Sequence, residues 1–156
     1  MDHHTGHAGH GRASWRVAVQ ATLHCLTGCA IGEVLGMVIG TALGWSATPT
    51  VVLAVALAFV FGYALTMRPL LRGGVDVRTA LKLALAADTV SITVMEIIDN
   101  AVMLAVPGAM EAGLAHPLFW ASLAFALAVA FVLTVPVNRW LITRGKGHAA
   151  VHQHHH

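Results

Sequence analysis

Four long apolar stretches alternate with short polar connections along the chain. They run over about 15–45, 49–71, 77–106 and 117–142, and the third is the most polar. Each is near or above the roughly 20 residues that an α-helix needs to cross the hydrocarbon of a bilayer. Short connections favour antiparallel packing of consecutive helices. The pattern therefore predicts an all-α fold, an integral membrane four-helix bundle.

Composition supports a membrane protein and excludes several other classes. Hydrophobic residues make up 57% of the 156 residues and charged residues 10%, whereas soluble domains carry roughly 25% charge. This excludes a typical cytosolic enzyme, a disordered chain and a nucleic-acid binder with a basic face. No phosphate loop, nucleophile elbow or zinc-protease motif is present. We therefore expect the lipid bilayer as a partner, no nucleic acid and no enzymatic activity.

The basic residues indicate how the bundle is oriented. All nine Lys and Arg residues lie before the first stretch, around the second connection or at the end of the fourth stretch. By the positive-inside rule, both termini are cytoplasmic, and we expect a bacterial inner (cytoplasmic) membrane. The chain then divides into a histidine-rich cytoplasmic tail over 1–14, a transmembrane domain over 15–143 and a second histidine-rich tail over 144–156. The last three histidines fit either a native metal-binding tract or the remnant of a purification tag.

Glycine recurs at every fourth position of the first stretch. Such spacing forms a flat groove on which another helix can approach closely. We expect the groove to pack on a helix of the same chain, with the third helix as one possibility, or on a second copy of the chain. A single four-helix bundle is narrow for a transport path, which also favours a homo-oligomer. The helix-packing glycines are Gly28, Gly32, Gly36, Gly40 and Gly44.

A polar stripe lies beside the glycines on the first stretch. Cys25, Cys29, Glu33 and Met37 are successive i, i+4 neighbours, and His24 lies on the glycine ridge itself. A buried cysteine is usually a small hydrophobic residue. A carboxylate in mid-membrane costs several kcal/mol unless it is paired, protonated or bound to a cation.

The third stretch carries a second polar stripe with three carboxylates. It contains Asp88, Met95, Glu96, Asp99 and Met103 on one broad face. No Lys or Arg lies in the middle of any stretch, so internal salt bridges cannot neutralise these acids. They must hold protons, face water or meet a bound cation. The alternative is a set of protonated acids that bond to one another and to nearby Ser and Asn.

The two stripes match in depth. At 1.5 Å per residue from the basic anchors, the levels are roughly 9–14, 20, 25 and 31 Å into the membrane. The first and third helices could therefore form one polar file. The sets at similar depth are His24 and Cys25 with Asp88, Cys29 with Met95 and Glu96, Glu33 with Asp99, and Met37 with Met103.

These residues favour a protein that binds and transports a transition-metal cation. Cysteine and methionine favour Cu(I), while histidine with carboxylates also suits Zn(II). The candidate metal residues are His24, Cys25, Cys29, Glu33, Asp88, Met95, Glu96 and Asp99, with Met37 and Met103 as a secondary site or path.

Two alternatives from other classes stay open. One is a haem-binding electron-transfer protein in which His24 and either a methionine or His116 are the axial ligands. The other is a structural or assembly subunit of a membrane complex, in which the polar stripes pair with helices of another protein.

Three runs carry a resemblance to a known family. These are HCLTGCAIGE at 24–33, PVNRWLI at 136–142 and RGKGH at 144–148. They resemble a bacterial family of multi-pass membrane proteins known as domain of unknown function 4396, with HCxxGCxxGE as the most specific part. The similarity covers about 15–148. It implies a small multi-pass bacterial protein and no established activity.

Overall fold

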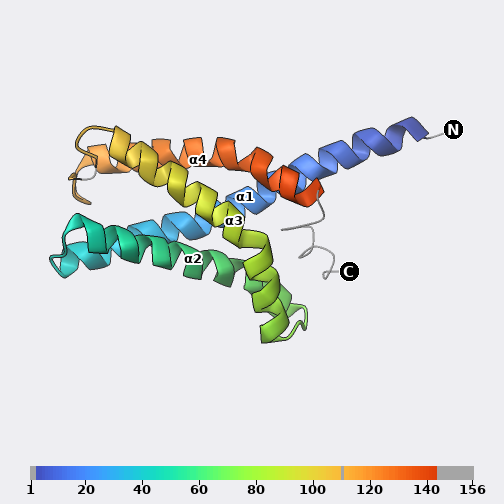
Figure 1. Ribbon diagram of the computed structural model, residues 1–156, viewed down its shortest axis with the longest axis horizontal. Helices are drawn as coiled ribbons and strands as arrows, with labels where there is room; N and C mark the ends of the chain where they lie inside the picture. Colours follow the sequence, from blue (N-terminus) through green and yellow to red (C-terminus); the bar gives the residue numbers. More distant parts are fainter. Residues whose placement is uncertain (1–2, 110, 144–156) are drawn as a thin grey trace.

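The computed structural model describes residues 3–109 and 111–143, with side chains from Trp15 onward. These residues form four helices joined by short connections, and the described part of the chain contains no strand (Figure 1). The predicted all-α bundle is therefore confirmed. The helices are α1 (His3–Ala42), α2 (Ala47–Arg72), α3 (Val77–Ala105) and α4 (Pro117–Thr143).

The helix ends follow local chemistry. The side chain of Asp76 accepts a hydrogen bond from the Thr79 amide at 3.3 Å and caps α3. Gly44 and Gly74 have φ angles of +70° and +89°, which favour glycine, and they turn the chain after α1 and α2. The helix α1 begins at His3, so its backbone includes most of the tract predicted as a tail. The second predicted tail, 144–156, lies outside the described residues.

Each helix contacts its two neighbours in a ring. The helix α1 packs on α2 and α4, and α3 packs on the same two helices. A smaller contact joins α1 and α3 across the diagonal of the bundle. Figure 1 shows α1 continuing beyond the bundle at its N-terminal end. We call the end of the bundle with the α2–α3 connection the basic end, and the opposite end, with the α1–α2 and α3–α4 connections, the cavity end.

The glycine groove of α1 packs on α2, so the prediction of a partner helix within the same chain is confirmed, whereas the expected closure on the third helix is wrong. A Cβ atom added at Gly28 would lie 2.7 Å from the Gly62 backbone, and one added at Gly36 would lie 2.6 Å from Ala54 Cα. The helix α2 supplies a matching row of small residues, which allows this close approach. Gly44 is not part of the groove, because α1 ends at Ala42 and nothing lies within 4 Å of an added Cβ.

The outer surface is apolar on all four helices. Three helical segments are long and apolar enough to cross a membrane, namely Trp15–Ala42, Ala47–Arg72 and Pro117–Thr143. The helix α3 has 29 residues and buries its acids while exposing Val90, Ile97 and Leu104. An apolar exterior around buried carboxyl groups is the arrangement expected in lipid.

Candidate functional site

The polar stripes of α1 and α3 face each other across the bundle, and we call their shared surface the seam. The Cys25 thiol donates to Asp88 Oδ1 at 3.6 Å. One level further toward the cavity end, the Cys29 side chain lies beside Glu96. The facing of the two helices, predicted from depth alone, is confirmed by these contacts.

The next level of the seam is a pair of carboxyl groups. Glu33 on α1 and Asp99 on α3 lie next to each other, close enough for their side chains to interact electrostatically. Two adjacent carboxylates repel each other when both are ionised, so a proton or a cation between them would stabilise the pair. Asn100 donates to the Glu96 carbonyl at 2.8 Å and to its Oε2 at 3.4 Å, which steadies the third carboxyl group beside the pair.

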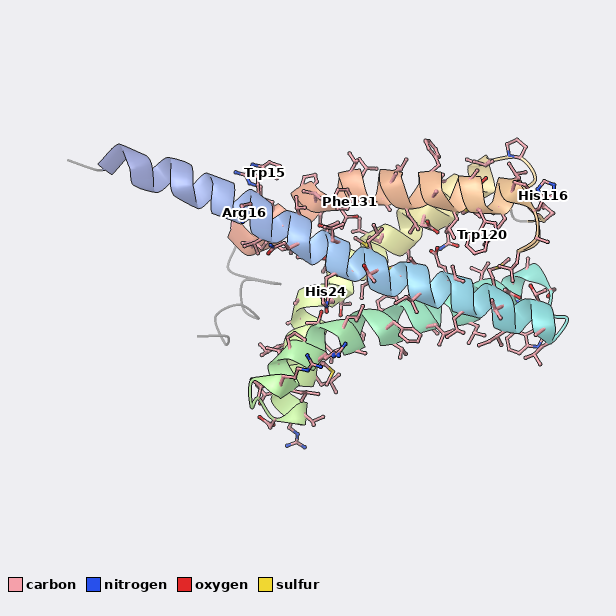
Figure 2. The ribbon with its side chains drawn as sticks, turned by 180° about the vertical axis from the view of Figure 1, so that it is seen from behind. Trp15, Arg16, His24, His116, Trp120 and Phe131 are labelled. Atoms are coloured by element: carbon pink, nitrogen blue, oxygen red, sulfur yellow. The ribbon has the colours of Figure 1, made fainter. Side chains whose placement is uncertain are left out.

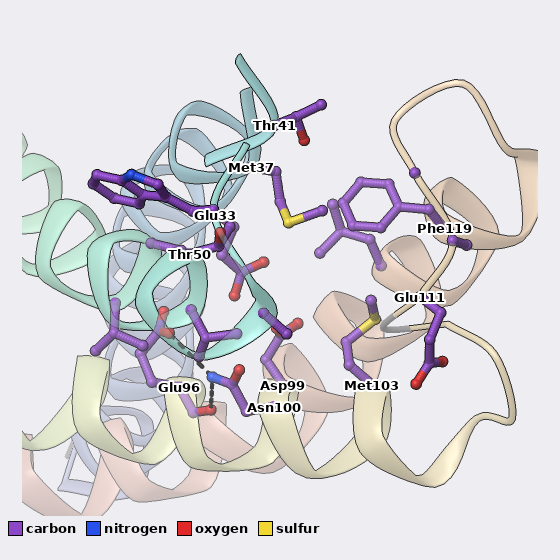
Figure 3. A pocket seen from close by; sticks show the side chains of 18 residues that line it. Glu33, Met37, Thr41, Thr50, Glu96, Asp99, Asn100, Met103, Glu111 and Phe119 are labelled. Atoms are coloured by element: carbon purple, nitrogen blue, oxygen red, sulfur yellow. Dashed lines mark hydrogen bonds between the residues drawn. The ribbon is translucent and has the colours of Figure 1, made fainter. Parts of the chain in front are cut away.

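A cavity of about 360 Å³ leads to these carboxyl groups (Figure 3). It reaches from Trp45 and Glu111, which are exposed at the cavity end, to the three buried acids. Met37 and Met103 line it between these two levels, so both predicted secondary residues lie on the same path. The cavity therefore joins the surface to the middle of the seam.

Each of the three acids keeps one buried oxygen without a hydrogen-bond partner. These atoms are Glu33 Oε2, Glu96 Oε1 and Asp99 Oδ1, and the three side chains are 8%, 5% and 3% exposed. Within the described part of the chain, no Lys or Arg forms an ion pair with any of them. Buried acceptors in this state are costly unless a proton or a cation reaches them.

A layer of sulfur atoms lies next to the carboxyl groups, on the side toward the basic end. Cys25, Cys29 and Met95 belong to one buried cluster, in which Ile92 and Ala130 also pack. Neither cysteine forms a disulfide. Two thiols and one thioether in a dry cluster are soft donors of the kind that Cu(I) prefers.

A buried hydrogen-bond network crosses the seam beside the Cys25–Asp88 pair. Asn138 on α4 donates to Thr22 Oγ1 on α1 at 2.8 Å and accepts from the Ser91 hydroxyl on α3. All three side chains are 0% exposed. The sequence analysis missed this network, because Asn138 stands next to Arg139 in a stretch that is otherwise apolar.

The helix α4 forms a third wall of the seam. Beside four larger apolar residues, it buries small or polar residues at every fourth position: Ser122, Ala126, Ala130, Thr134 and Asn138. The same spacing that marked the groove in the first stretch could have identified this face. The signal is weaker here, because the repeated positions hold four residue types instead of glycine alone.

His24 and His116 lie apart from the seam and from each other. His24 lies one turn before Gly28 on the ridge that faces α2, and its Nε2 atom is buried without a partner. His116 lies in the α3–α4 connection, where its Nδ1 accepts from the Leu118 amide. Figure 2 shows the two rings far apart along the bundle. Within one copy of the chain, His24 and His116 are therefore too far apart to bind the two faces of one haem, and haem binding through His24 and a methionine stays a prediction.

The described residues contain no group of three or more His, Cys, Asp and Glu side chains arranged to hold a metal ion. The structure stacks the predicted ligands in pairs, level above level, rather than gathering them around one point. Their role as metal ligands stays a prediction.

Comparison with known proteins identifies a family and no individual relative. No curated protein and no solved structure matches the chain. The family described as "Domain of unknown function (DUF4396)" matches residues 14–147, which is most of the chain and includes every residue of the seam. The chain belongs to this family of domains of unknown function.

Proposed function

We propose that this protein binds a transition-metal cation in the seam between α1 and α3 and moves it across the membrane, with Cu(I) as the preferred ion. The observation that supports the proposal most directly is the set of three unpartnered carboxyl oxygens at the floor of the cavity. A cation that enters from the cavity end meets these oxygens first.

The energetics of burial favour a cation or proton at this floor. Ionised carboxylates in a membrane interior cost several kcal/mol unless their charge is compensated. No basic side chain in the described residues compensates Glu33, Glu96 or Asp99. A bound cation relieves this cost, and protons relieve it when the cation is absent. Exchange of one for the other is therefore a natural property of the site.

The sulfur layer favours a soft ion over a hard one. Below the floor, the next donors are Cys29, Met95 and Cys25. Thiolate and thioether ligands select Cu(I), whereas hard ions such as Mg²⁺ prefer oxygen. His24 lies on the ridge facing α2, so the set of donors in the seam fits Zn(II) less well than the sequence suggests.

Pairs of donors at successive levels favour transport of an ion over its retention. An ion that crosses a membrane must bind favourably enough to enter and weakly enough to leave. A closed cage of four ligands would hold the ion, whereas two donors at each level let it step from Glu33 and Asp99 to Cys29 and Glu96, then to Cys25 and Asp88. The absence of a preformed metal cage in the described residues is compatible with such steps.

The setting of this activity is part of the proposal. The positive-inside rule puts the basic end, and with it both termini, in the cytoplasm of a bacterium. The cavity then opens to the outer side of the inner membrane. A homo-oligomer would widen the narrow bundle. Because the glycine groove is occupied by α2, a second copy would have to bind through another face.

A titration with Cu(I) tests the proposal. The protein is purified in detergent without a nickel step, reduced and titrated with Cu(I) against a coloured competing chelator. We expect tight binding that releases protons, because thiols must lose their protons to ligate metal. The double variant Cys25→Ser with Cys29→Ser should lose at least 100-fold in affinity. Glu111→Gln, at the exposed mouth of the cavity, is the matched control and should bind as the wild type does.

Two results would contradict the proposal. One is wild-type affinity in the double cysteine variant while the helical content is retained. The other is a wild-type protein that binds neither Cu(I) nor Zn(II) and instead purifies with a stoichiometric protein partner, which would favour the assembly subunit.

A further inference from the structure

The seam is closed at the level of the Cys25–Asp88 pair. The side chains of Thr22, Cys25, Asp88, Ser91 and Asn138 are all 0% exposed. None of them lines the cavity, which ends at Glu33, Glu96 and Asp99. The structure is therefore open toward the cavity end and shut toward the basic end.

The amide of Asn138 ties three helices together in this closed layer. Its nitrogen donates to Thr22 on α1, and its oxygen accepts from Ser91 on α3. Thr22 remains satisfied as a donor, because its own hydroxyl bonds to the Ala18 carbonyl at 2.6 Å. A buried amide with both ends paired contributes to specificity of packing, and removal of its partners is costly.

The segment of α4 that carries Asn138 is joined to the rest of its helix at a weak point. Pro136 stands two residues earlier, inside the helix. Proline has no amide hydrogen, so the bond to the carbonyl one turn earlier is missing, and helices bend at such positions. The last residues of α4 are thus joined to their own helix by one hydrogen bond fewer, and side-chain contacts help to hold them in place.

Arg139 provides a second attachment for the same segment. Its guanidinium carbon lies 4.3 Å from the centroid of the Trp15 ring on α1. A cation over an aromatic face is attracted to it. Two successive residues, Asn138 and Arg139, therefore fasten the end of α4 to α1, one inside the bundle and one at its rim.

We propose that the segment of α4 after Pro136 is the gate of the seam at the basic end, with Asn138 as its latch. The inference rests on the proposed function to the extent that a transport path needs a gate at each end. A carrier that opened its site to both sides at once would leak, so it exposes the site to one side at a time. When the two hydrogen bonds of Asn138 break, the segment rotates about Pro136. This opens the path from the sulfur layer to the basic end.

The two native cysteines report on this gate without any metal. The chain is reconstituted in vesicles, and a membrane-impermeant thiol reagent is applied from the side of the basic end. Mass spectrometry then maps the label to Cys25 or Cys29. In the wild type we expect slow labelling from this side. Asn138→Leu keeps most of the volume and removes both hydrogen bonds, and it should raise the labelling rate at least tenfold.

Controls separate gating from general loosening. Ser122→Ala, on the same face of α4 near the cavity end, should leave the labelling from the basic end at the wild-type rate. If Asn138→Leu does not insert in the membrane, Ser91→Ala removes only one of the two bonds and should give a smaller increase. The labelling rates from the cavity end should stay the same in all variants.

The inference is overturned if Asn138→Leu inserts with full helical content and its labelling from the basic end does not rise. An equal rise from both sides, or an equal rise in Ser122→Ala, would also overturn it, because either result means loss of packing rather than release of a latch. The readout does not involve metal, so failure to bind Cu(I) would defeat the proposed function and leave this result intact.

Discussion

The thiol of Cys25 on α1 donates a hydrogen bond to Asp88 Oδ1 on α3 across the diagonal of the bundle, at 3.6 Å. Both residues are 0% exposed. Neighbouring pairs of helices are held by many small residues in contact, whereas α1 and α3 meet over a smaller surface. Polar pairs along the seam therefore carry much of the direct attachment between these two helices.

Replacement of the Cys25 thiol should weaken this attachment. We expect Cys25→Ala to lower the free energy of unfolding in detergent by about 1 kcal/mol, the typical net contribution of a hydrogen bond. Cys25→Ser keeps a hydroxyl donor at the same position and should lose less. Denaturant unfolding followed by circular dichroism measures the difference. Equal losses in the two variants would mean that the thiol acts only by its volume.

The contact between the glycine groove and α2 should be sensitive to a single methyl group. A Cβ atom at Gly32 would lie 2.5 Å from Ala58 Cα, which is closer than real Cβ contacts come. We expect Gly32→Ala to cost about 1–3 kcal/mol, as overpacking of a close interface does. Gly113→Ala is the matched control, because nothing lies within 4 Å of its added Cβ. Unfolding midpoints in the same detergent compare the two, and an unchanged Gly32→Ala midpoint would contradict the close contact.

The sequence predicts the helices and the facing of α1 and α3, because both depend on patterns within single helices. Hydrophobic length marks the spans, and a constant rise per residue places Cys29 level with Glu96 and Glu33 level with Asp99. These quantities need no knowledge of how the helices pack.

The partner of the glycine groove and the partners of Asn138 could not be predicted in this way. The glycine spacing shows that α1 has a groove, but a groove fits any row of small residues, and the row on α2 is inconspicuous within an apolar stretch. Asn138 precedes Arg139, and a basic residue near the end of a span is typical of the membrane interface, so the sequence does not indicate that Asn138 is buried. Successive residues on a helix point about 100° apart, so one can face the bundle interior while the other reaches its rim.

Orientation in the membrane can be tested with reporter fusions. Because all nine basic residues lie toward one side, fusions at Ala47 and Gly113 should report the outer side, and a fusion at Gly73 the cytoplasm. The helix α3 is the critical element, since its buried acids keep it from being recognised as a span by composition. A cytoplasmic reporter at Gly113 would show that α3 does not cross.

Stability should depend on pH through the cap of α3. Hydrogen bonds from the side chain and backbone of Thr79 hold the pKa of Asp76 below its usual value of 3.8. A carboxyl group whose pKa is lowered by folding contributes stability above its unfolded pKa and loses that contribution as the pH falls through the folded value. Asn caps helices well and does not titrate in this range.

The comparison is therefore between the wild type and Asp76→Asn. Thermal unfolding in detergent should show a higher Tm for the wild type at pH 7, because the charged cap also interacts favourably with the helix dipole. That advantage should shrink steadily as the pH is lowered from 4 to 2.5. A gap that stays constant over this range would mean that the Asp76 charge contributes nothing to the cap.

Proton release on metal binding should depend on the carboxyl pair at the cavity floor. Glu33 and Asp99 lie next to each other, and each has a buried oxygen without a partner, so a cation that binds these oxygens displaces a proton held between them. Binding should therefore weaken as the pH falls, and Glu33→Gln should release about one proton fewer per ion than the wild type. Titration calorimetry in two buffers of different ionisation enthalpy counts these protons. Glu111→Gln, exposed at the mouth of the cavity, should match the wild-type count.

The same variant separates binding from transport. Because the thiols of Cys25 and Cys29 remain, Glu33→Gln should lose less affinity than the double cysteine variant. It should move the ion across the membrane of vesicles at least tenfold more slowly. Wild-type proton release in Glu33→Gln would show that the pair holds no exchangeable proton, and the ion would then have to move without exchange at this floor.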